Sequence, residues 1–506
     1  MKFAKLLADL YNHFMRKRYI STPIYYANGA PHVGHLYTTL IADVMKRAGA
    51  LMGEEIFFLS GMDEHGQKVA QAALAQGYSA KEHVDFISEE FWNFFNSFNI
   101  FPDCWIRTTD KDHEKAAQAF WQKVQENGYI YKSKYAGWYH LSDENYLNEA
   151  AAEEFADGKN PNVVWREEDC YFFKLSAFKD RLMEFLAANP GFIYPKKRYN
   201  EVMGWFAKDL KDFAVSRPKE RLSWGVEVPG DPSHVMYVWI DALVNYLSAI
   251  GYPDEKYKEL WPGTHLLGKE IVKFHAIYWP ALLMAAGVEL PKQLFVHGWL
   301  LMGDDKISKS LGNAVSLDEI VAKYQVDGLR YYLLKGLEFG EDGQFREDLV
   351  KQVVNGDLAN KFGNIFLRLL GIVELAFENR LPEAPEFSDS EMLEKLQKVY
   401  NFVKEIPEHP QKINEYLNSF MDCVLAVNSY FEENRVWTIE DRAQKAGILY
   451  FLLDFLKKLT ILVSPVMPNV AEKIMGFFQL QNSMESYNTP LNRVFNTSRP
   501  VLFPKI

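Results

Sequence analysis

The stretch RYISTPIYYANGAPHVGHLYTTLIADVMKRAGA, residues 18–50, decides how the chain begins to fold. Residues 18–26 are rich in β-branched and aromatic side chains, and the turn-forming residues 27–31 end this run. The apolar residues that follow recur with the period of an α-helix and predict a helix that buries one face. That face consists of Leu36, Leu40, Ile41, Val44, Met45 and Ala48. A buried-strand pattern at 56–59 comes next, and strand, helix, strand in this order predicts a parallel α/β sheet.

The same alternation returns in the second half of the chain, after an aromatic-rich segment that we interpret as an insertion. We expect strands at 235–239, 265–267 and 294–296, with helices at 241–250 and 271–286. From about residue 346 onward the pattern is helical almost throughout. The sequence therefore predicts five parts: an N-terminal extension (1–17), the two halves of a Rossmann-like α/β domain (18–119 and 216–345), an inserted α+β connective domain (120–215) and an α-helical bundle (346–506).

Composition excludes several classes of protein. Apolar residues make up 48% and charged residues 24% of the 506 residues, which is typical of a globular chain in water. The net charge of −11 does not exclude a nucleic-acid partner, because local basic patches make phosphate contacts. The three scattered cysteines, Cys104, Cys170 and Cys423, rule out a disulfide framework. No C-x-x-C pair occurs, so a cysteine zinc site is not available.

No membrane span is expected. The most apolar stretch, 448–466, contains Asp454, Lys457 and Lys458, which predicts a buried helix instead. The basic N-terminal run lacks the long apolar centre of a secretion signal. We expect a cytoplasmic protein. The mitochondrial matrix is the alternative that a basic transit peptide would imply, and Asp9 argues against it.

Two short motifs indicate nucleotide chemistry. The first, His32-Val33-Gly34-His35, follows the first strand and opens a helix. A glycine there leaves room for a nucleotide against the backbone, and the helix N-terminus and the two imidazoles can bind phosphate oxygens. On its own this motif is also compatible with two surface histidines in a turn.

The second motif is Lys306-Ile307-Ser308-Lys309-Ser310, in a loop flanked by two glycines. Two lysines interleaved with hydroxyl residues suit a mobile loop that offsets the charge of departing pyrophosphate. A solvated basic loop is the alternative for this motif alone. Both motifs together, in this order, favour a nucleotide-using enzyme.

The two motifs resemble the signatures of class I aminoacyl-tRNA synthetases. Residues 25–29 before the first and 311–313 after the second are similar to the methionine enzymes in particular, and the resemblance covers nearly the whole chain. It implies an ATP-dependent ligase that forms methionyl-adenylate and pyrophosphate and then transfers methionine to the 3′ end of initiator and elongator tRNA(Met). It also implies catalytic roles for His32, His35, Lys306 and Lys309. The ATP-binding positions would be His32, Gly34, His35, Gly268, Glu270, Lys306, Ser308, Lys309 and Ser310.

A methionine pocket must be apolar and aromatic, because a thioether forms favourable contacts with rings but only weak hydrogen bonds. It also needs a carboxylate for the substrate ammonium, and Asp63 follows the second strand. The resemblance implies that methionine binds at Ile24, Tyr26, Asp63, Trp239, Leu243, Tyr246, Phe274 and His275. Many relatives have proline where this chain has Leu243. For any one aromatic residue, packing in the core remains the alternative.

The inserted domain resembles the branch of the family without zinc-binding cysteine pairs. Its stretch 137–144 offers His140 as a lone candidate ligand, and one imidazole without thiolate partners is more often a packed surface residue. We therefore expect no metal ligands from the protein, no structural zinc, and ATP with Mg²⁺ as the cofactor.

The helical part resembles the anticodon-binding bundle of the family, which implies anticodon contacts at Asn364, Arg368 and Trp437. Asn364 and Arg368 are four residues apart and so share a helix face. The expected partners are tRNA(Met), methionine and ATP, without a membrane. We expect a monomer, because no further tRNA-binding or dimerisation module follows the bundle.

Three other functions fit parts of the sequence. A small adenylyltransferase also uses an H-x-G-H turn but needs only one α/β domain. The leucine, isoleucine and valine synthetases carry a larger editing insertion, and the cysteine enzyme uses zinc thiolates. A non-catalytic tRNA-binding relative could lose one motif, whereas this chain keeps both. Methionine-dependent exchange of ATP with pyrophosphate separates all of these.

Overall fold

A seven-stranded parallel sheet is the centre of the catalytic half. The structure, a computed structural model, describes residues 17–140, 145–146, 163–302, 305–306 and 317–503. Its sheet has the order β2-β3-β1-β13-β14-β8, and β4 pairs with β3. All of these pairings are parallel. The strands are β1 (Lys17–Ser21), β2 (Tyr25–Tyr26), β3 (Glu55–Asp63), β4 (Cys104–Arg107), β8 (Ile193–Tyr194), β13 (Thr264–Gly268) and β14 (Gln293–His297). The expected parallel α/β sheet is confirmed.

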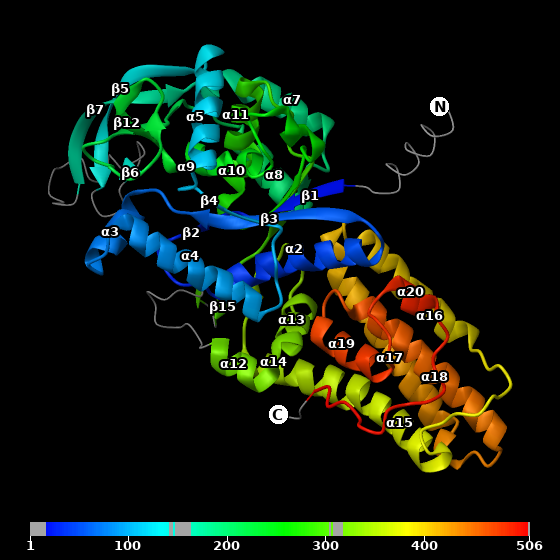
Figure 1. Ribbon diagram of the computed structural model, residues 1–506. Helices are drawn as coiled ribbons and strands as arrows, with labels where there is room; N and C mark the ends of the chain where they lie inside the picture. The colour runs from blue at the N-terminus through cyan, green and yellow to red at the C-terminus, as the bar shows by residue number, and fades with distance from the viewer. Residues whose placement is uncertain (1–16, 141–144, 147–162, 303–304, 307–316, 504–506) are drawn as a thin grey trace, which may run out of the picture.

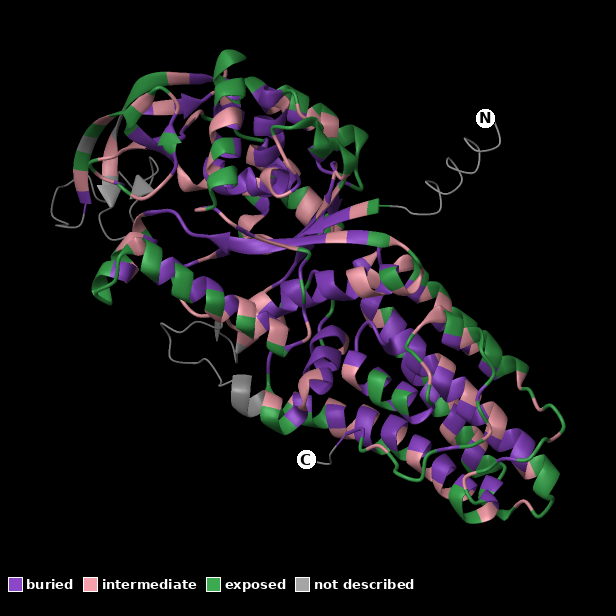
Figure 2. Cartoon of the chain, viewed as in Figure 1, coloured by how far each residue is buried: buried purple, intermediate pink, exposed green. Residues whose placement is uncertain are grey.

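Helices cover both faces of this sheet (Figure 1). Helices α2 (Val33–Leu51) and α4 (Ala80–Ser97) lie below it in that view, and α5 (Lys111–Glu126) and α11 (Trp279–Ala286) lie above it. Successive strand residues pack into different cores. Leu266 belongs to the cluster under α2, whereas Leu267 belongs to the cluster under α11. The strands are therefore apolar on both faces, as Figure 2 shows by their burial.

The helix predicted from residues 36–48 is confirmed as α2. All six residues of its predicted buried face are buried. Its first turn is held by a capping box, in which the His32 side chain accepts from the N3 backbone and the His35 side chain accepts from the N-cap backbone. The motif that we read as a nucleotide site is thus also the cap of the helix.

The strand expected at 235–239 is wrong in its extent and its partners. Strand β12 (Asp231–Met236) ends earlier and forms a small antiparallel sheet with β10 (Ser216–Pro218) and β11 (Glu227–Val228). Helix α9 (Val238–Leu243) begins where the strand was expected to continue, and α10 (Asn245–Ser248) follows it. A short apolar run fits either a strand or a buried helix, and here tertiary packing selects the helix.

The segment expected as an insertion forms a second, antiparallel sheet in the order β6-β5-β7-β9. Strands β5 (Ile130–His140) and β7 (Val163–Phe173) pair along their whole lengths, with β6 (Asn145–Tyr146) and β9 (Phe213–Ala214) at the edges. Between β7 and β9 the chain passes through α7 (Lys179–Ala188), β8 and α8 (Lys196–Trp205). Strand β8 pairs with β14, so the range 120–215 also contributes a strand to the parallel sheet.

From residue 346 to residue 503 the chain is helical almost throughout, as predicted, and a small sheet of the order β16 (Asp305–Lys306), β15 (Leu300–Met302), β17 (Gly343–Gln344) precedes this part. Helix α13 (Val326–Lys335) leads into a bundle that extends away from the sheet (Figure 1). The bundle consists of α14 (Glu347–Val353), a π-helical turn (Val354–Gly363), α15 (Asn364–Phe377), α16 (Ser390–Glu405), α17 (Ile413–Glu433), α18 (Arg442–Val463), α19 (Pro468–Phe477) and α20 (Met484–Asn488). Residues 448–463 lie in α18, where Lys457 is buried and paired with Asp454. None of the helices that the structure describes is long and apolar enough to cross a bilayer.

One buried guanidinium joins the sheet domain to the bundle. Arg330 of α13 is fully buried and donates to the backbone oxygens of Pro465 (2.9 Å), Val466 (2.8 Å) and Phe98 (2.9 Å). It also donates to Oδ2 of Asp43, on α2, at 2.6 Å. Its partners come from the catalytic domain and from the bundle, so Arg330 fixes the position of one against the other.

We predict that Arg330→Met lowers the free energy of unfolding by about 3–5 kcal/mol, because it leaves buried oxygens without their donor. Chemical or thermal denaturation of the purified chain measures this. The matched control is Arg346→Met, which removes an exposed arginine paired with Asp348 and should change stability by less than about 1 kcal/mol. Equal stability of the two variants would contradict the role of Arg330.

Candidate active site

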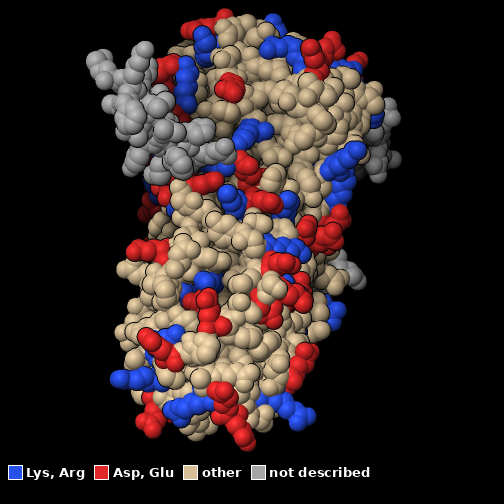
Figure 3. All heavy atoms as spheres, turned by 90° about the vertical axis from the view of Figure 1, so that its right-hand side faces the viewer, with Lys and Arg blue, Asp and Glu red and all other residues tan. Residues whose placement is uncertain are grey.

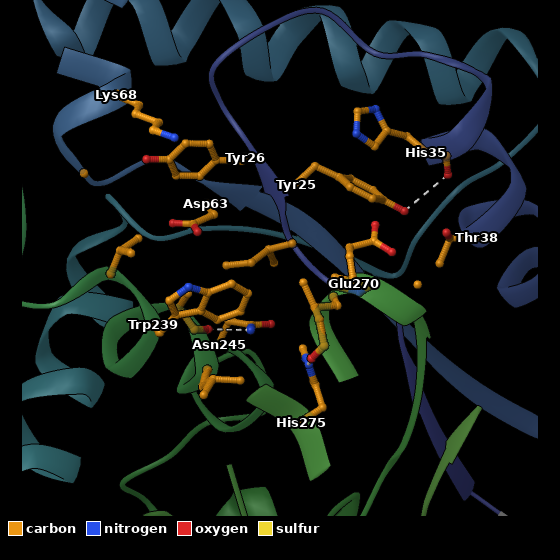
Figure 4. A pocket seen from close by; sticks show the side chains of 18 of the residues that line it. Tyr25, Tyr26, His35, Thr38, Asp63, Lys68, Trp239, Asn245, Glu270 and His275 are labelled. Atoms are coloured by element: carbon orange, nitrogen blue, oxygen red, sulfur yellow. Dashed lines mark hydrogen bonds between the residues drawn. The ribbon is translucent and has the colours of Figure 1, made fainter. Parts of the chain in front are cut away.

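A cavity of about 510 Å³ opens at the carboxyl ends of the parallel strands, where α/β sheets bind ligands. Both halves of the domain line it. In Figure 4, Asp63 lies on one side with Tyr26 and Lys68, and His35 and Thr38 lie on the other. The predicted residues among its walls are Ile24, Tyr26, His32, Gly34, His35, Asp63, Trp239, Leu243, Tyr246, Gly268, Glu270 and His275. Residues far apart in the sequence thus meet at one site.

The geometry of the first motif sets the direction of its imidazoles. Nδ1 of His32 accepts from the backbone N–H of Gly34 at 3.1 Å, and Nδ1 of His35 accepts from the backbone N–H of His32 at 3.3 Å. A neutral ring that accepts at Nδ1 carries its proton at Nε2, so each ring offers a donor away from the backbone. The two rings stack with their centroids 3.7 Å apart. A Cβ at Gly34 would lie 2.9 Å from Cε1 of His32, so any other residue there would force this imidazole to shift.

Asp63 is a buried carboxylate at the end of β3. It is 9% exposed, and its Oδ1 has no hydrogen-bond partner among the described residues. Burial raises the pKa of Asp63 well above the usual aspartate value, and the negative charges of Asp241 and Glu64 raise it further. A carboxylate in this setting is stabilised by a cation that enters the cavity.

The opposite wall is aromatic. The ring of Trp239 stacks on Phe274 with centroids 3.5 Å apart and an angle of 7° between the planes. Phe274 therefore supports Trp239 from behind and is not among the residues that line the cavity. Nδ1 of His275 donates to the backbone oxygen of Ile271 (3.0 Å), so its Nε2 accepts from the hydroxyl of Tyr246 (2.7 Å). Burial lowers the pKa of His275 to about 4, which keeps the ring neutral at pH 7.

At the other end of the cavity, Glu270 and Gly268 lie beside Trp299. The indole N–H of Trp299 donates to Oε2 of Glu270 at 2.9 Å. Lys269 lies 3.9 Å from the centroid of the Trp299 ring and pairs with Asp342. A Cβ at Gly268 would lie 2.5 Å from Oε2 of Glu270, so only glycine lets this carboxylate approach the backbone.

Several lining residues were not predicted. Asn245 is 1% exposed, and its Nδ2 donates to the backbone oxygen of Ala242 at 2.6 Å. Its Oδ1 has no hydrogen-bond partner in the part of the chain that the structure describes. Arg217 lies 4.5 Å from the centroid of the Tyr237 ring. Neither residue belongs to a motif, and the only signal in the sequence is the position of Asn245 beside Tyr246. The other unpredicted polar residues of the wall include Lys68, Arg221, His297 and Trp299.

Comparisons with known proteins agree with this geometry. The family model described as "tRNA synthetases class I (M)" matches residues 18–158 and 154–370, and the model "Anticodon-binding domain of tRNA ligase" matches residues 389–497. Methionine–tRNA ligase of Thermotoga maritima is 41% identical over 471 residues, which cover 90% of this chain and 74% of that protein. The Brucella suis enzyme of the same name is 39% identical and is covered to 91%, as is this chain. This chain belongs to the methionyl-tRNA synthetase family.

Solved structures carry the same likeness over the whole fold. Mycobacterium tuberculosis methionyl-tRNA synthetase in complex with methionyl-adenylate aligns with a TM-score of 0.89 and 36% identity, covering 97% of this synthetase and 100% of that chain. Its free form aligns with a TM-score of 0.82 and 34% identity, over 97% and 98% of the two chains.

The second motif of this synthetase lies mostly outside the described residues. The backbone of Lys306 belongs to β16 (Asp305–Lys306), which pairs with β15 (Leu300–Met302). Strand β15 follows Trp299, so the loop begins at the wall of the cavity. Ser308, Lys309 and Ser310 lie outside the described residues, and their roles stay predictions.

The predicted anticodon residues of this synthetase lie on the bundle. The Arg368 guanidinium lies 5.8 Å from the centroid of the Trp437 ring and forms an ion pair with Glu432. Trp437 is 42% exposed and packs partly on Phe431. Asn364 is exposed one turn before Arg368, at the start of α15. Acidic and basic side chains are interspersed on the face that Figure 3 shows, so charge alone does not mark an RNA surface there.

Metal ligands are not clustered in the part of the chain that the structure describes, where no group of three or more His, Cys, Asp or Glu residues converges. The backbone of His140 ends β5, and residues 141–144 of the stretch 137–144 lie outside the described residues. The expectation of a zinc-free synthetase therefore stays a prediction.

The raised pKa of Asp63 predicts an effect on stability. The folded chain holds this proton more tightly than the unfolded chain, so the stabilising contribution of the carboxyl group is lost as pH rises above about 4. Asp63→Asn does not titrate and should raise the melting temperature of the ligand-free synthetase, by more at pH 8 than at pH 5. The control Asp112→Asn changes an exposed aspartate and should have no such effect. A lower melting temperature of Asp63→Asn at pH 8 would show that the carboxylate is already compensated.

Proposed function

We propose that Asp63 binds the ammonium of methionine in this cavity and that the turn of His32 and His35 binds the phosphates of ATP. The chain is a methionine–tRNA ligase, which activates methionine with ATP to methionyl-adenylate and pyrophosphate and then transfers methionine to tRNA. The observation that carries the proposal is the buried Oδ1 of Asp63, which has no hydrogen-bond partner in the described structure and lines the same cavity as the capped turn. A substrate ammonium supplies the missing partner.

In this proposal the thioether of methionine lies along the aromatic wall. Trp239, held by Phe274, offers a ring face, and sulfur forms favourable contacts with aromatic rings. Tyr246 and His275 are neutral and bonded to each other, so they add no charge beside an apolar side chain. The remaining contacts are Ile24, Tyr26 and Leu243.

ATP occupies the other end in this proposal. The Nε2–H groups of His32 and His35 and the N-terminus of α2 bind phosphate oxygens, and Gly34 leaves space for them. Glu270, beside Gly268, accepts from a ribose hydroxyl. Mg²⁺ binds phosphate oxygens and needs few protein ligands, and it would offset part of their charge. Lys306 and Lys309 offset the charge of the departing pyrophosphate, and Ser308 and Ser310 donate hydrogen bonds to it.

Catalysis of this reaction then requires that the substrates are held in position and that the negative charge of the phosphates is compensated. The methionine carboxylate attacks the α-phosphorus of ATP in line with the leaving pyrophosphate, so one P–O bond forms as another breaks. The ribose hydroxyl at the tRNA 3′ end next attacks the carbonyl of the adenylate and displaces AMP. No bond to the protein forms in either step, and the residues contribute by orientation and by stabilising negative charge.

Replacing His35 or Lys309 with alanine should slow methionine-dependent ATP–pyrophosphate exchange by about a hundredfold, because each change removes a donor or cation from the developing charge. The KM for methionine should change by less than about threefold, since neither residue contacts that substrate. The control Lys323→Ala removes an exposed lysine of α12 (Leu317–Tyr324) that pairs with Glu347. Near-normal exchange in both variants would refute the roles of the two motifs.

The bundle binds the anticodon of tRNA(Met) in this proposal, with Trp437 stacking on a base and Arg368 and Asn364 contacting base edges. Its support is the half-exposed indole beside a guanidinium, since aromatic rings and arginine planes are the usual platforms for unpaired bases. Glu432 pairs with Arg368 in the RNA-free chain, so base contact exchanges one partner of Arg368 for another.

Trp437→Ala should lower kcat/KM for tRNA charging by about 5- to 150-fold, which corresponds to loss of one base-stacking contact. Exchange activity and melting temperature should stay close to those of the parent chain. Phe86→Ala, which removes an aromatic ring that is 58% exposed on α4, is the matched control. If exchange and stability fall together with charging, Trp437 serves the bundle core and not the anticodon.

We further propose that the synthetase acts as a monomer in the cytoplasm. Both halves of the domain contribute to the described wall of the cavity, which supports a site formed within one subunit. All three cysteines are free thiols, in keeping with a reducing compartment. Light scattering of the purified chain at micromolar concentration tests the monomer, and fractionation of source cells separates the cytoplasm from the mitochondrial matrix.

A further inference from the structure

Behind Asp63 lies a buried carboxylate held between two histidines. Asp241 of α9 is 1% exposed, and its Oδ2 accepts from Nδ1 of His65 at 2.7 Å. Its Oδ1 accepts from Nε2 of His113 at 2.9 Å. His65 follows the end of β3, two residues after Asp63, and His113 lies in the first turn of α5. The other ring nitrogen of His113 contacts Oγ of Ser248 at 2.8 Å. Neither histidine lines the cavity.

The remaining charges near this cluster have partners of their own. Glu64, between Asp63 and His65, is buried and forms an ion pair with Arg107 at 2.6 Å. The acidic groups that act on His65 are Asp241, Glu114 and Glu64, and those that act on Asp63 are Asp241 and Glu64. Asp241 therefore differs from Glu64. Among the described contacts, the charge of Asp241 is balanced by two imidazole rings and by no lysine or arginine.

We propose that His65 and His113 are positioning residues that offset the charge of Asp241, which makes it easier for Asp63 to ionise and bind the methionine ammonium. The inference rests on the proposed role of Asp63. Asp63 and Asp241 are both buried, and the charge of Asp241 acts on Asp63. Two such carboxylates cannot both ionise cheaply unless one has a cation, because each disfavours the charge of the other. An imidazolium on Asp241 removes that conflict and leaves Asp63 available to the substrate.

The electrostatics agree with this arrangement. Although burial alone would raise it, the charges and hydrogen bonds of His65 and His113 lower the pKa of Asp241 to about 2. Burial lowers the pKa of His65, but the charge and hydrogen bond of Asp241 outweigh burial and raise it above the usual histidine value. The carboxylate of Asp241 and the imidazolium of His65 thus stabilise each other, whereas burial, followed by the charges of Asp241 and Glu64, raises the pKa of Asp63.

The same bonds also align the two walls of the methionine site. Asp241 lies on the helix that carries Trp239 and Leu243, and His65 follows the strand that ends at Asp63. Figure 4 shows Asp63 and Trp239 facing the same space from these two elements. The His65–Asp241 bond ties the carboxylate wall to the aromatic wall.

The test uses His65→Asn, whose amide can still donate to Asp241 but carries no charge. With the synthetase at pH 7, we expect the methionine KM in the exchange assay to rise about tenfold and kcat to change by less than about twofold. A tenfold rise corresponds to an upward shift of about one unit in the pKa of Asp63. Ionised Asp63 is the binding form, so the defect should shrink at pH 8.5. His113→Gln should behave alike, and His234→Asn, which breaks a His–Asp pair outside the cavity, should not.

The double variant His65→Asn/Asp241→Asn removes both charges and should bring the methionine KM back to within about threefold of the parent. A merely structural role predicts that the double variant is at least as impaired as the single one, at every pH, and that outcome overturns the inference. An unchanged KM in His65→Asn and His113→Gln overturns it as well. The variant Asp63→Asn separates the two proposals. If it leaves the methionine KM unchanged, the proposed role of Asp63 is wrong. If it raises the methionine KM while the histidine variants leave it unchanged, only the proposed role of the histidines is wrong.

Discussion

The synthetase has one buried carboxyl group, Asp63, whose Oδ1 has no hydrogen-bond partner among the described residues, and the proposed role of the cavity depends on it. Asp63 lies at the end of a strand that is buried on both faces, and burial raises its pKa well above the usual aspartate value. Ionising such a group costs stability in the free protein, and in our proposal its charge contributes binding energy in the complex with methionine. The surrounding residues limit this cost: Arg107 pairs with Glu64, and two histidines pair with Asp241. Among these buried acids, Asp63 is thus the one without a cationic partner among the described contacts.

Helix α2 links this chemistry to the bundle that recognises RNA in our proposal. Its first turn holds the imidazoles of His32 and His35, and its third turn holds Asp43, which pairs with Arg330. Arg330 in turn binds backbone oxygens next to α19. A buried guanidinium with four acceptors has little freedom to move, so the helix and the bundle keep one relative position.

Much of the sheet could be predicted, because its strands and α2 follow the periods that burial imposes. The residues of α2 that recur with helical spacing are all buried. Prediction failed where a short apolar run had two solutions: residues 238 and 239 begin α9 because the strand before them pairs with β10 and β11. The two-residue strand β8 is too short to carry a periodic signal, and only its pairing with β14 defines it.

The sequence by itself determined the family and the candidate residues of the site, since the two motifs, Asp63 and the aromatic residues are local patterns that resemble those of the methionine enzymes. Tertiary structure alone decided which charged groups lie in contact and compensate each other. His65 and His113 are 176 and 128 residues from Asp241, and no local pattern predicts those bonds. It also decided that Phe274 supports Trp239 and that Asn245 faces the cavity. Electrostatic and packing energies depend on distance in space, which sequence separation does not reveal.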